Sequence, residues 1–189
     1  MVERIESMGI PVYAVDPRNL NSVMETILAI GRLMKAENTA RDLVQTMQLR
    51  VARVLTKVSQ TACRPRVFFQ IGISPIVSVG TDTFIHELIE KAGGTNLAAG
   101  DTPYPRFSRE QVLGLSPDVI IITSMARTDI FERVKEEWSR WPNMPAVQNQ
   151  KIFIADSNLF DRPSPRLVEA IELLARLIHP EFIKENQSP

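Results

Sequence analysis

The feature that most constrains the fold is a series of short apolar segments separated by helical patterns, which begins after Cys63-Arg64-Pro65. Strands are expected at residues 66–71, 118–123 and 151–155, and helices at 82–92, 108–115, 128–140 and 165–179. This alternation predicts an α/β fold, a parallel sheet with helices on both faces. The apolar run at 119–122 suits a central parallel strand, because such a strand is buried on both sides.

The first 62 residues carry two helical patterns behind a short apolar segment. Residues 2–8 resemble the end of a helix, Gly9 a helix stop, and 10–15 a short strand. Ser22 and Glu25 have the spacing of a capping box, followed by an apolar helix that extends to Met34. A second helix is expected from about residue 39 to about residue 60, long enough at about 1.5 Å per residue to bridge two lobes.

The N-terminal strand expected at residues 10–15 has no partner in the sequence. One strand and one helix end cannot bury themselves, so this piece needs neighbours. We therefore expect the chain to begin in the middle of a domain.

Composition narrows the class of partner. Lys plus Arg and Asp plus Glu both number 22 in 189 residues, so no basic excess indicates nucleic acid. No apolar run approaches the roughly 20 residues of a membrane span, and the start lacks the pattern of a signal peptide. A soluble chain that binds a small molecule or a neutral partner fits best.

Few residues have the arrangement of a catalytic or metal site. In an open α/β sheet ligands bind beyond the carboxyl ends of the strands, here residues 72–75, 124–127 and 156–162, and none of these segments pairs a nucleophile with a base. His86 and Glu90 lie four residues apart, but a solvated helix face explains them more simply than a metal. Gly93-Gly94 indicates a helix C-cap. The single cysteine, Cys63, is expected to be a partly buried, unreactive thiol.

Three polar or aromatic positions have both a functional and a structural interpretation. Tyr104 lies between two prolines, which suits a ring that stacks on a flat ligand, or one that covers the core. In the functional interpretation, Arg162 faces the ligand crevice. In the structural one, Pro165 only starts a helix and Asp161 pairs with a neighbouring arginine. Glu110 follows Ser108, a helix cap with Gln111, and complements the helix dipole.

The tryptophans have a single interpretation. Trp138 and Trp141 flank a turn that contains Pro142. Both are predicted to pack rather than to recognise a ligand.

Five runs follow one another along the chain: RVFFQIG (66–72), GTDTFIHELIEKAGGTN (80–96), PYPRFSREQVL (103–113), SPDVIIIT (116–123) and FDRPSPR (160–166). Their order resembles a known family, the helical-backbone class of periplasmic binding proteins for cobalamin, haem and ferric siderophores, and the resemblance extends over residues 1–179. The proline-flanked aromatic and the last run are most similar to the cobalamin-binding members.

The resemblance implies a binding site. Tyr104 would stack on the ligand, where a tryptophan is more usual, and Arg162 would be a polar contact. Asn158 stands where the cobalamin binders carry an aspartate. The pocket lining would include Pro75, Ile76 and Val77. Cobalamin or a related corrinoid is the expected ligand, with haem or a ferric siderophore as the alternative; no further cofactor is expected.

The resemblance also implies partners, location and organisation. Glu110 would dock onto an ABC permease, on the periplasmic or extracytoplasmic side of a membrane. Residues 1–36 would be the remnant of an N-terminal lobe, 37–62 the connecting backbone helix, and 63–189 the C-terminal α/β lobe.

Two functions of other classes stay open. The chain would be a truncated half-receptor that self-associates through the N-terminal segment without binding ligand, because large exposed apolar surfaces usually find a partner. An enzyme on a similar lobe is the third possibility, since fold does not fix function.

Overall fold

The computed structural model describes residues 2–123, 128–160 and 162–184. Its central element is a parallel sheet of four strands in the order β3-β1-β5-β6. The strands are β1 (Arg66–Gln70), β3 (Thr95–Asn96), β5 (Val119–Ile122) and β6 (Ile152–Ile154). A separate antiparallel pair joins β2 (Ile76–Val77) to β4 (Arg106–Phe107). The expected α/β fold with a parallel sheet is confirmed.

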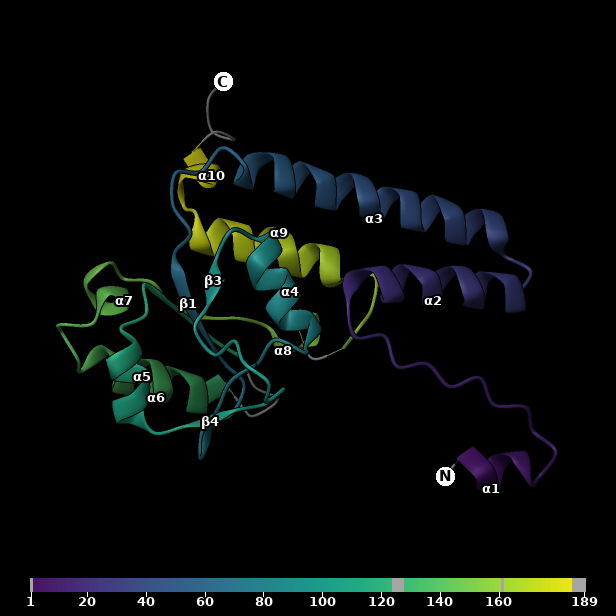
Figure 1. The fold of residues 1–189 in the computed structure, drawn as a ribbon, viewed down its shortest axis with the longest axis horizontal. Helices are drawn as coiled ribbons and strands as arrows, with labels where there is room; N and C mark the ends of the chain where they lie inside the picture. The colour runs from purple at the N-terminus through teal and green to yellow at the C-terminus, as the bar shows by residue number, and fades with distance from the viewer. Residues whose placement is uncertain (1, 124–127, 161, 185–189) are drawn as a thin grey trace.

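Alternate residues of the central strands belong to two separate hydrophobic cores, one on each face of the sheet. Val67 and Phe69 of β1 point to one face and Phe68 to the other, as the two-residue period of a strand requires. Helices α4 (Phe84–Lys91) and α9 (Leu167–Ile178) cover the first face. Helices α5 (Arg109–Leu115), α6 (Thr128–Ser139) and α7 (Pro145–Gln148) cover the second. Figure 1 shows these two groups of helices on opposite sides of β1.

Helix α9 is largely buried between other helices. Its buried residues are Leu167, Val168, Ala170, Ile171, Leu174, Ala175 and Ile178. They lie on more than one side of the helix because α4 contacts one side and α3 (Glu37–Val58) another. Two short helices flank α9 in sequence, α8 (Ser157–Phe160) before it and α10 (Glu181–Lys184) after it.

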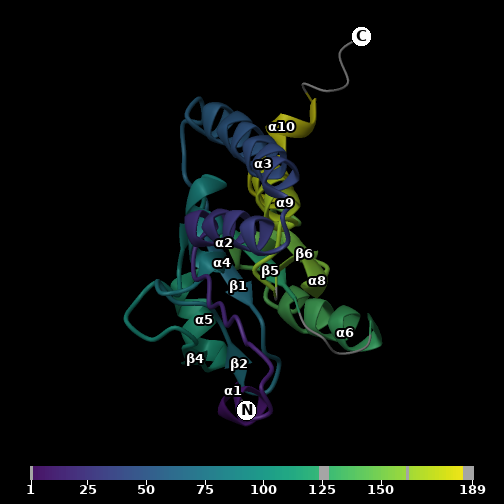
Figure 2. The ribbon, with the colours of Figure 1, turned by 90° about the vertical axis from the view of Figure 1, so that its right-hand side faces the viewer.

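Helices α2 (Leu20–Leu33) and α3 form a hairpin outside α9. Gly31 makes this close approach possible, because a Cβ at that position would collide with Cβ of Ala40. Helix α3 contributes Val44, Met47, Val51 and Val54 to the larger core, as its predicted apolar stripe requires. Its 22 residues correspond to about 33 Å. Figures 1 and 2 both show α2 and α3 stacked on the α9 side of the sheet.

The N-terminal segment differs from the sequence prediction. Helix α1 (Val2–Glu6) ends before Gly9, whose φ is +76°, so the predicted helix stop is confirmed. The strand predicted at 10–15 is wrong: these residues form no ladder. A strand needs a neighbour to receive its backbone hydrogen bonds, and no described segment lies beside this one. In Figure 1, α1 and the segment after it extend away from the sheet.

Several local predictions also need correction. The capping box of α2 joins Asn19 and Ser22, not Ser22 and Glu25, because the helix begins two residues before Ser22. Helix α3 begins at Glu37 instead of 39, and α9 begins two residues after Pro165. Cys63 is exposed rather than partly buried. None of the helices in the described ranges is long and apolar enough to cross a bilayer.

Candidate ligand-binding face

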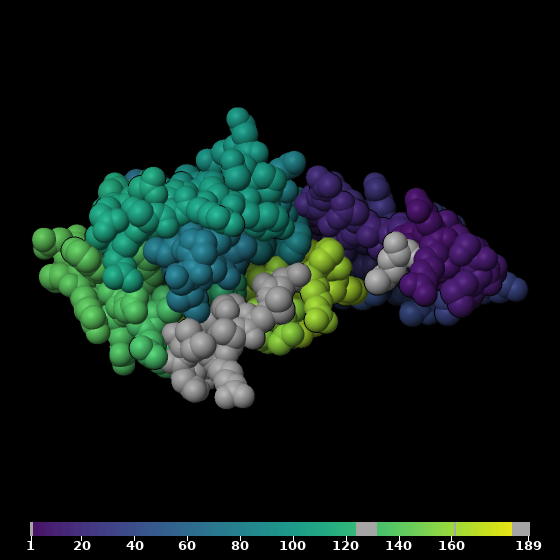
Figure 3. All heavy atoms as spheres, turned by 90° about the horizontal axis from the view of Figure 1, so that it is seen from below, coloured from purple at the N-terminus to yellow at the C-terminus, as the bar shows by residue number. Residues whose placement is uncertain are grey.

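Because β1, β5 and β6 are parallel, the segments that follow them meet at one edge of the sheet. Residues 71–79 follow β1 and residues 155–160 and 162–166 follow β6. Residues 124–127, which were expected to contribute after β5, lie outside the described residues, as does Asp161. The loop between β3 and β4 crosses the same edge. Figure 3, seen from below, shows the loop residues near 75, 100 and 160 on one face.

The turn after β1 is held by buried polar groups. Gln70 Nε2 donates to the Gly72 carbonyl at 2.9 Å, and Trp138 Nε1 donates to Gln70 Oε1 at 2.9 Å. Ser78 Oγ donates to the Phe69 carbonyl at 2.6 Å. Such buried hydrogen bonds are costly to break, so the turn is fixed. The packing role predicted for Trp138 is confirmed, whereas Trp141 is exposed.

The residues predicted to line the pocket lie on this fixed turn. Pro75 is exposed, and Ile76 and Val77 are half-buried on β2. Ile76 also packs against the smaller core cluster. The turn therefore offers a firm, partly apolar surface at the edge of the sheet.

Tyr104 is presented by a loop tied down at several points. The Pro103 carbonyl accepts from Gly80 N at 2.8 Å, and the Pro105 carbonyl accepts from Ser78 N at 3.0 Å. Gly80 is needed there, since a Cβ would collide with the Thr102 carbonyl. The Tyr104 side chain is 57% exposed. The interpretation of Tyr104 as a core cover is therefore wrong, and the ring is free to contact a ligand.

A shallow pocket beside Tyr104 joins three parts of the chain. It is lined by Asp16, Pro17, Arg18, Asp82, Thr83, Phe84, Pro103, Tyr104 and Pro163. Pro163 is the neighbour of Arg162, so the structure brings the Tyr104 loop and the Arg162 segment to one pocket. Sequence reasoning missed Asp16 and Asp82, because nothing local in the sequence placed the segment before α2 next to the start of α4.

Asn158 and Arg162 follow β6. Asn158 is exposed at the start of α8, and its backbone N and side-chain Nδ2 both donate to Asp156 Oδ1 at 2.9 Å. Arg162 is exposed and forms no hydrogen bond or ion pair within the described part of the chain. Asp156 was not singled out from the sequence, although its place directly after a strand was the available signal. It supplies a carboxylate next to the neutral Asn158.

Glu110 lies at the first turn of α5, six residues after Tyr104. Ser108 and Gln111 form the predicted capping box. A hydrogen bond from its own backbone N–H, helped by the Ser108 hydroxyl, lowers the pKa of the Glu110 carboxyl below its ordinary value. Glu110 is therefore an exposed anion at neutral pH.

His86 and Glu90 have structural partners. His86 Nδ1 lies 3.1 Å from Asn96 Nδ2, and Glu90 Oε2 pairs with Arg64 Nη2 at 2.8 Å. Among the described residues no three His, Cys, Asp or Glu side chains gather as a metal site. The pair fastens α4 to the strand region instead.

Comparison with known proteins assigns the family. The sequence profile of the periplasmic binding protein family matches residues 3–159, and the chain belongs to this family. An uncharacterised ABC transporter substrate-binding lipoprotein of Bacillus subtilis is 29% identical over 97% of the chain and 59% of its own length. A cobalamin-binding protein of Halobacterium salinarum is 31% identical over 94% of the chain and 50% of its own length.

A solved structure supports the fold. The periplasmic haem-binding protein of Roseiflexus superposes with a TM-score of 0.81 at 20% identity, covering 94% of the chain and 70% of that structure. The chain is thus similar in sequence to a cobalamin-binding protein and in fold to a haem-binding protein. The chain spans between 50% and 64% of the length of the curated relatives it matches.

Proposed function

We propose that the chain is part of the solute-binding component of an ABC importer, that it captures cobalamin or a related corrinoid and delivers it to a permease without catalysing a reaction. The observation that carries the proposal is the exposed Tyr104 on its fixed loop, sharing a pocket with Pro163. Family membership supports the transport role, and the relative that is named a cobalamin-binding protein favours the corrinoid.

The chemistry of the face suits a macrocycle with polar side groups. A rigid aromatic ring stacks on a flat apolar surface at little entropic cost. Ile76 and Val77 extend that apolar contact. The amide of Asn158 and the guanidinium of Arg162 would hydrogen-bond the amide side groups at a corrin rim. The carboxylate of Asp156 would accept from the same amides.

Glu110 is proposed as the contact with the permease. Its carboxylate is exposed, and its hydrogen bonds keep it charged. Charge pairs at the rim of an interface chiefly set orientation and the rate of encounter. Because relatives are named periplasmic proteins or lipoproteins, we place this delivery at the outer side of a cytoplasmic membrane.

Equilibrium dialysis against cyanocobalamin, read by its visible absorbance, tests the proposal on the 189-residue chain. We expect saturable binding that weakens about tenfold or more in Tyr104→Ala and in Arg162→Gln, as lost stacking and charged hydrogen bonds predict. Trp141→Ala and Arg140→Gln are matched controls on other surfaces. Unchanged affinity in a variant combining Tyr104→Ala, Asn158→Ala and Arg162→Gln would overturn the site, and binding of haemin instead of cobalamin would select the haem alternative.

A second candidate function is self-association through the N-terminal region. Large apolar side chains are exposed there: Met8, Ile10, Tyr13, Ile30, Leu33 and Met34. Sedimentation over a wide range of concentrations tests it, with Leu33→Asp as the disrupting variant. A monomer at every concentration would exclude this function.

A further inference from the structure

The pocket beside Tyr104 contains a carboxylate that has no part in the ligand contacts proposed above. This pocket of about 330 Å³ is lined by the segment before α2, the start of α4, the β3–β4 loop and the segment after α8. Its acidic residues are Asp16 and Asp82. Ligand pockets commonly measure about 300–1,000 Å³, so this one has room for one edge or side group of a macrocycle.

Asp82 is held close to the β3–β4 loop by the two residues that precede it. Gly80 N donates to the Pro103 carbonyl at 2.8 Å, and Thr81 N donates to the Gly100 carbonyl at 3.2 Å. In return, Gly100 N donates to the Thr81 hydroxyl at 2.9 Å. Asp82 is the next residue, so its backbone is fixed relative to the loop that presents the aromatic ring.

The opposite wall of the pocket is positioned by the contact of α2 with α4. The backbone N of the buried Leu20, at the start of α2, donates to Glu87 Oε2 of α4 at 2.7 Å. Figures 1 and 2 both show the start of α2 beside α4. The segment with Asp16 and Arg18 directly precedes Leu20, so this hydrogen bond holds it next to the start of α4.

The two carboxylates of the pocket differ in their partners. Asp16 Oδ2 accepts from Arg18 Nε at 3.1 Å and lies 3.1 Å from Arg18 Nη2. Asp82 is exposed and forms no hydrogen bond or ion pair with any residue in 2–123, 128–160 or 162–184. The buried Thr83 already caps α4 through its own hydroxyl, so the helix start does not need the Asp82 side chain.

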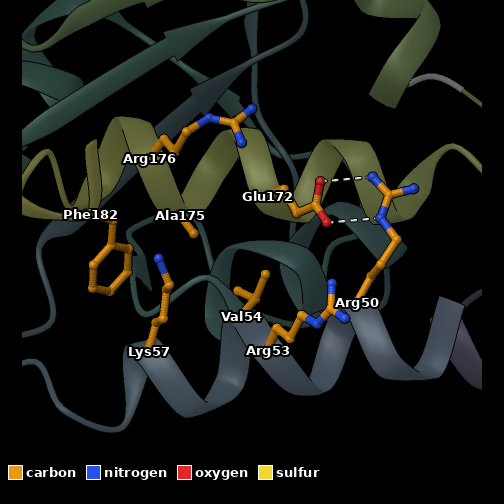
Figure 4. Close-up of a pocket in the computed structure, with 8 residues that line it drawn as sticks. All are labelled: Arg50, Arg53, Val54, Lys57, Glu172, Ala175, Arg176 and Phe182. Atoms are coloured by element: carbon orange, nitrogen blue, oxygen red, sulfur yellow. Dashed lines mark hydrogen bonds and ion pairs between the residues drawn. The ribbon is translucent and has the colours of Figure 1, made fainter. Parts of the chain in front are cut away.

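A carboxylate in another pocket shows the contrasting case. Glu172 lines a pocket between α3 and α9, where Arg50 Nε and Nη2 donate to its two oxygens at 2.9 and 2.7 Å. Figure 4 shows both oxygens turned toward Arg50. A two-point pair of this kind gives Glu172 a structural role. Asp82 has no such pair, and its oxygens are available to a ligand.

On the basis of the proposed corrinoid site at the Tyr104 face, we propose that Asp82 selects the ligand by its side groups. Its carboxylate accepts a hydrogen bond from an amide N–H of the ligand and repels a ligand carboxylate. An amide also offers a carbonyl oxygen to the guanidinium of Arg162, the neighbour of Pro163 in the pocket lining. A carboxylate satisfies only the guanidinium.

The selection separates the two kinds of macrocycle considered above. Corrinoids carry amide side groups, whereas haem carries carboxylates. Discrimination between similar ligands often depends on a group that acts against the wrong one. Asp82 supplies that group, because like charges brought together in a binding site are strongly unfavourable.

Two corrinoids with the same ring test this selection. Dicyanocobinamide carries amides where dicyanocobyrinic acid carries carboxylates. Equilibrium dialysis of each against the 189-residue chain, read by visible absorbance at about pH 7.5 and low ionic strength, measures the preference. We expect the parent chain to bind dicyanocobinamide about tenfold more tightly or better, and added salt to narrow that difference.

Substitutions of Asp82 should change the preference in a defined order. Asp82→Asn keeps the shape and an acceptor oxygen, and should narrow the preference about fivefold or more, chiefly through tighter binding of dicyanocobyrinic acid. Asp82→Lys should reverse the preference, which a mere loss of packing at an exposed position would not do. Asp101→Asn is the matched control, because it removes the same charge from the β3–β4 loop outside the pocket lining. It should leave the preference within about twofold of the parent.

The outcomes separate this selection from the proposed function. If dicyanocobinamide binds and Asp82→Asn leaves the preference unchanged, the role of Asp82 is overturned and the proposed function stands. Equal narrowing in Asp101→Asn would show a general charge effect and would also overturn it, as would a parent chain without any preference. If the parent chain binds neither corrinoid, the proposed function itself is refuted, and the selection by Asp82 with it.

Discussion

Residues 10–15 and 119–122 are both largely apolar, but only the second segment is buried. Ile120 is fully buried between two strands, whereas Ile10 is 51% exposed. The difference lies in what surrounds each segment. Strand β5 pairs with β1 and β6 and is covered by helices on both faces, whereas no strand among the described residues pairs with residues 10–15. Apolar sequence alone supplies the tendency to be buried, and the elements around it determine whether burial occurs.

The largest loss of stability is expected from a substitution that leaves a cavity in the buried region. Phe69 is fully buried in β1, with its ring 5.3 Å from that of Phe160. Phe69→Ala should lower the free energy of unfolding by about 3–5 kcal/mol, through lost transfer energy and a cavity. Urea unfolding followed by circular dichroism measures it. Phe69→Leu, which leaves a smaller cavity, should lose less, and an equal small loss in both variants would contradict the packing described.

A smaller effect is expected inside the helical hairpin, where α2 packs on α3. Gly31→Ala should destabilise by about 1–3 kcal/mol, because the new Cβ collides with Ala40. Gly114→Ala in α5 is the matched control, since nothing lies within 4 Å of its Cβ position. That control should stabilise by up to about 1 kcal/mol through helix propensity. Stabilisation by both substitutions would mean that α2 and α3 are farther apart than described.

The buried hydrogen bond beneath the binding face gives a comparable change. Trp138→Phe removes the donor to Gln70 Oε1, in a side chain that is 1% exposed. An unsatisfied buried acceptor costs about 1–3 kcal/mol. Thermal unfolding should show this loss, while Trp141→Phe at an exposed site should stay within about 0.5 kcal/mol of the parent. Equal changes in the two variants would exclude a special role for the Gln70 contact.

The sequence alone predicted the long strands and helices but not the short strands. The β1, β5 and β6 strands and the larger helices follow from apolar patterns, and those were predicted within a few residues. The short β2, β3 and β4 strands were missed because two residues carry no periodic signal. Their pairing depends on tertiary contacts, such as those that bring Ile76 opposite Phe107.

The candidate site was predictable only in part. Tyr104, Arg162, Asn158 and the 75–77 turn were selected from loop position and family resemblance, and whether they bind a ligand stays a prediction. Asp16 and Asp82 come together through folding alone.

The ion pair between α3 and α9 should make stability depend on pH. Arg50 lowers the pKa of the Glu172 carboxyl below its ordinary value of 4.5, chiefly by hydrogen bonding. The pair therefore contributes fully above the unfolded pKa, and the contribution is lost as pH falls through the lower folded pKa. Both side chains remain about a third exposed, so the contribution is only about 0.5–1 kcal/mol.

Glu172→Gln tests that contribution. It should remove the loss of stability below about pH 4.5 that is due to this group, with little change in slope above pH 6. Urea midpoints measured across this range report it, with Asp16→Asn as a control because Asp16 pairs with Arg18 at an exposed site. An unchanged acid profile in Glu172→Gln would show that the pair does not stabilise the packing of α3 on α9.

The smallest effect on stability is expected in the N-terminal segment. This segment also gives the most direct test of the contrast between residues 10–15 and 119–122. Tyr13 is 56% exposed and residues 2–19 contain no buried side chain. Tyr13→Ala should change the free energy of unfolding by less than about 0.5 kcal/mol. Backbone amides of residues 10–15 should exchange with solvent almost as fast as in an unfolded chain, because they have no ladder partner. Slow exchange there that becomes fast on dilution would instead require a second copy of the chain to cover the segment, and Leu33→Asp should then accelerate exchange at the same amides.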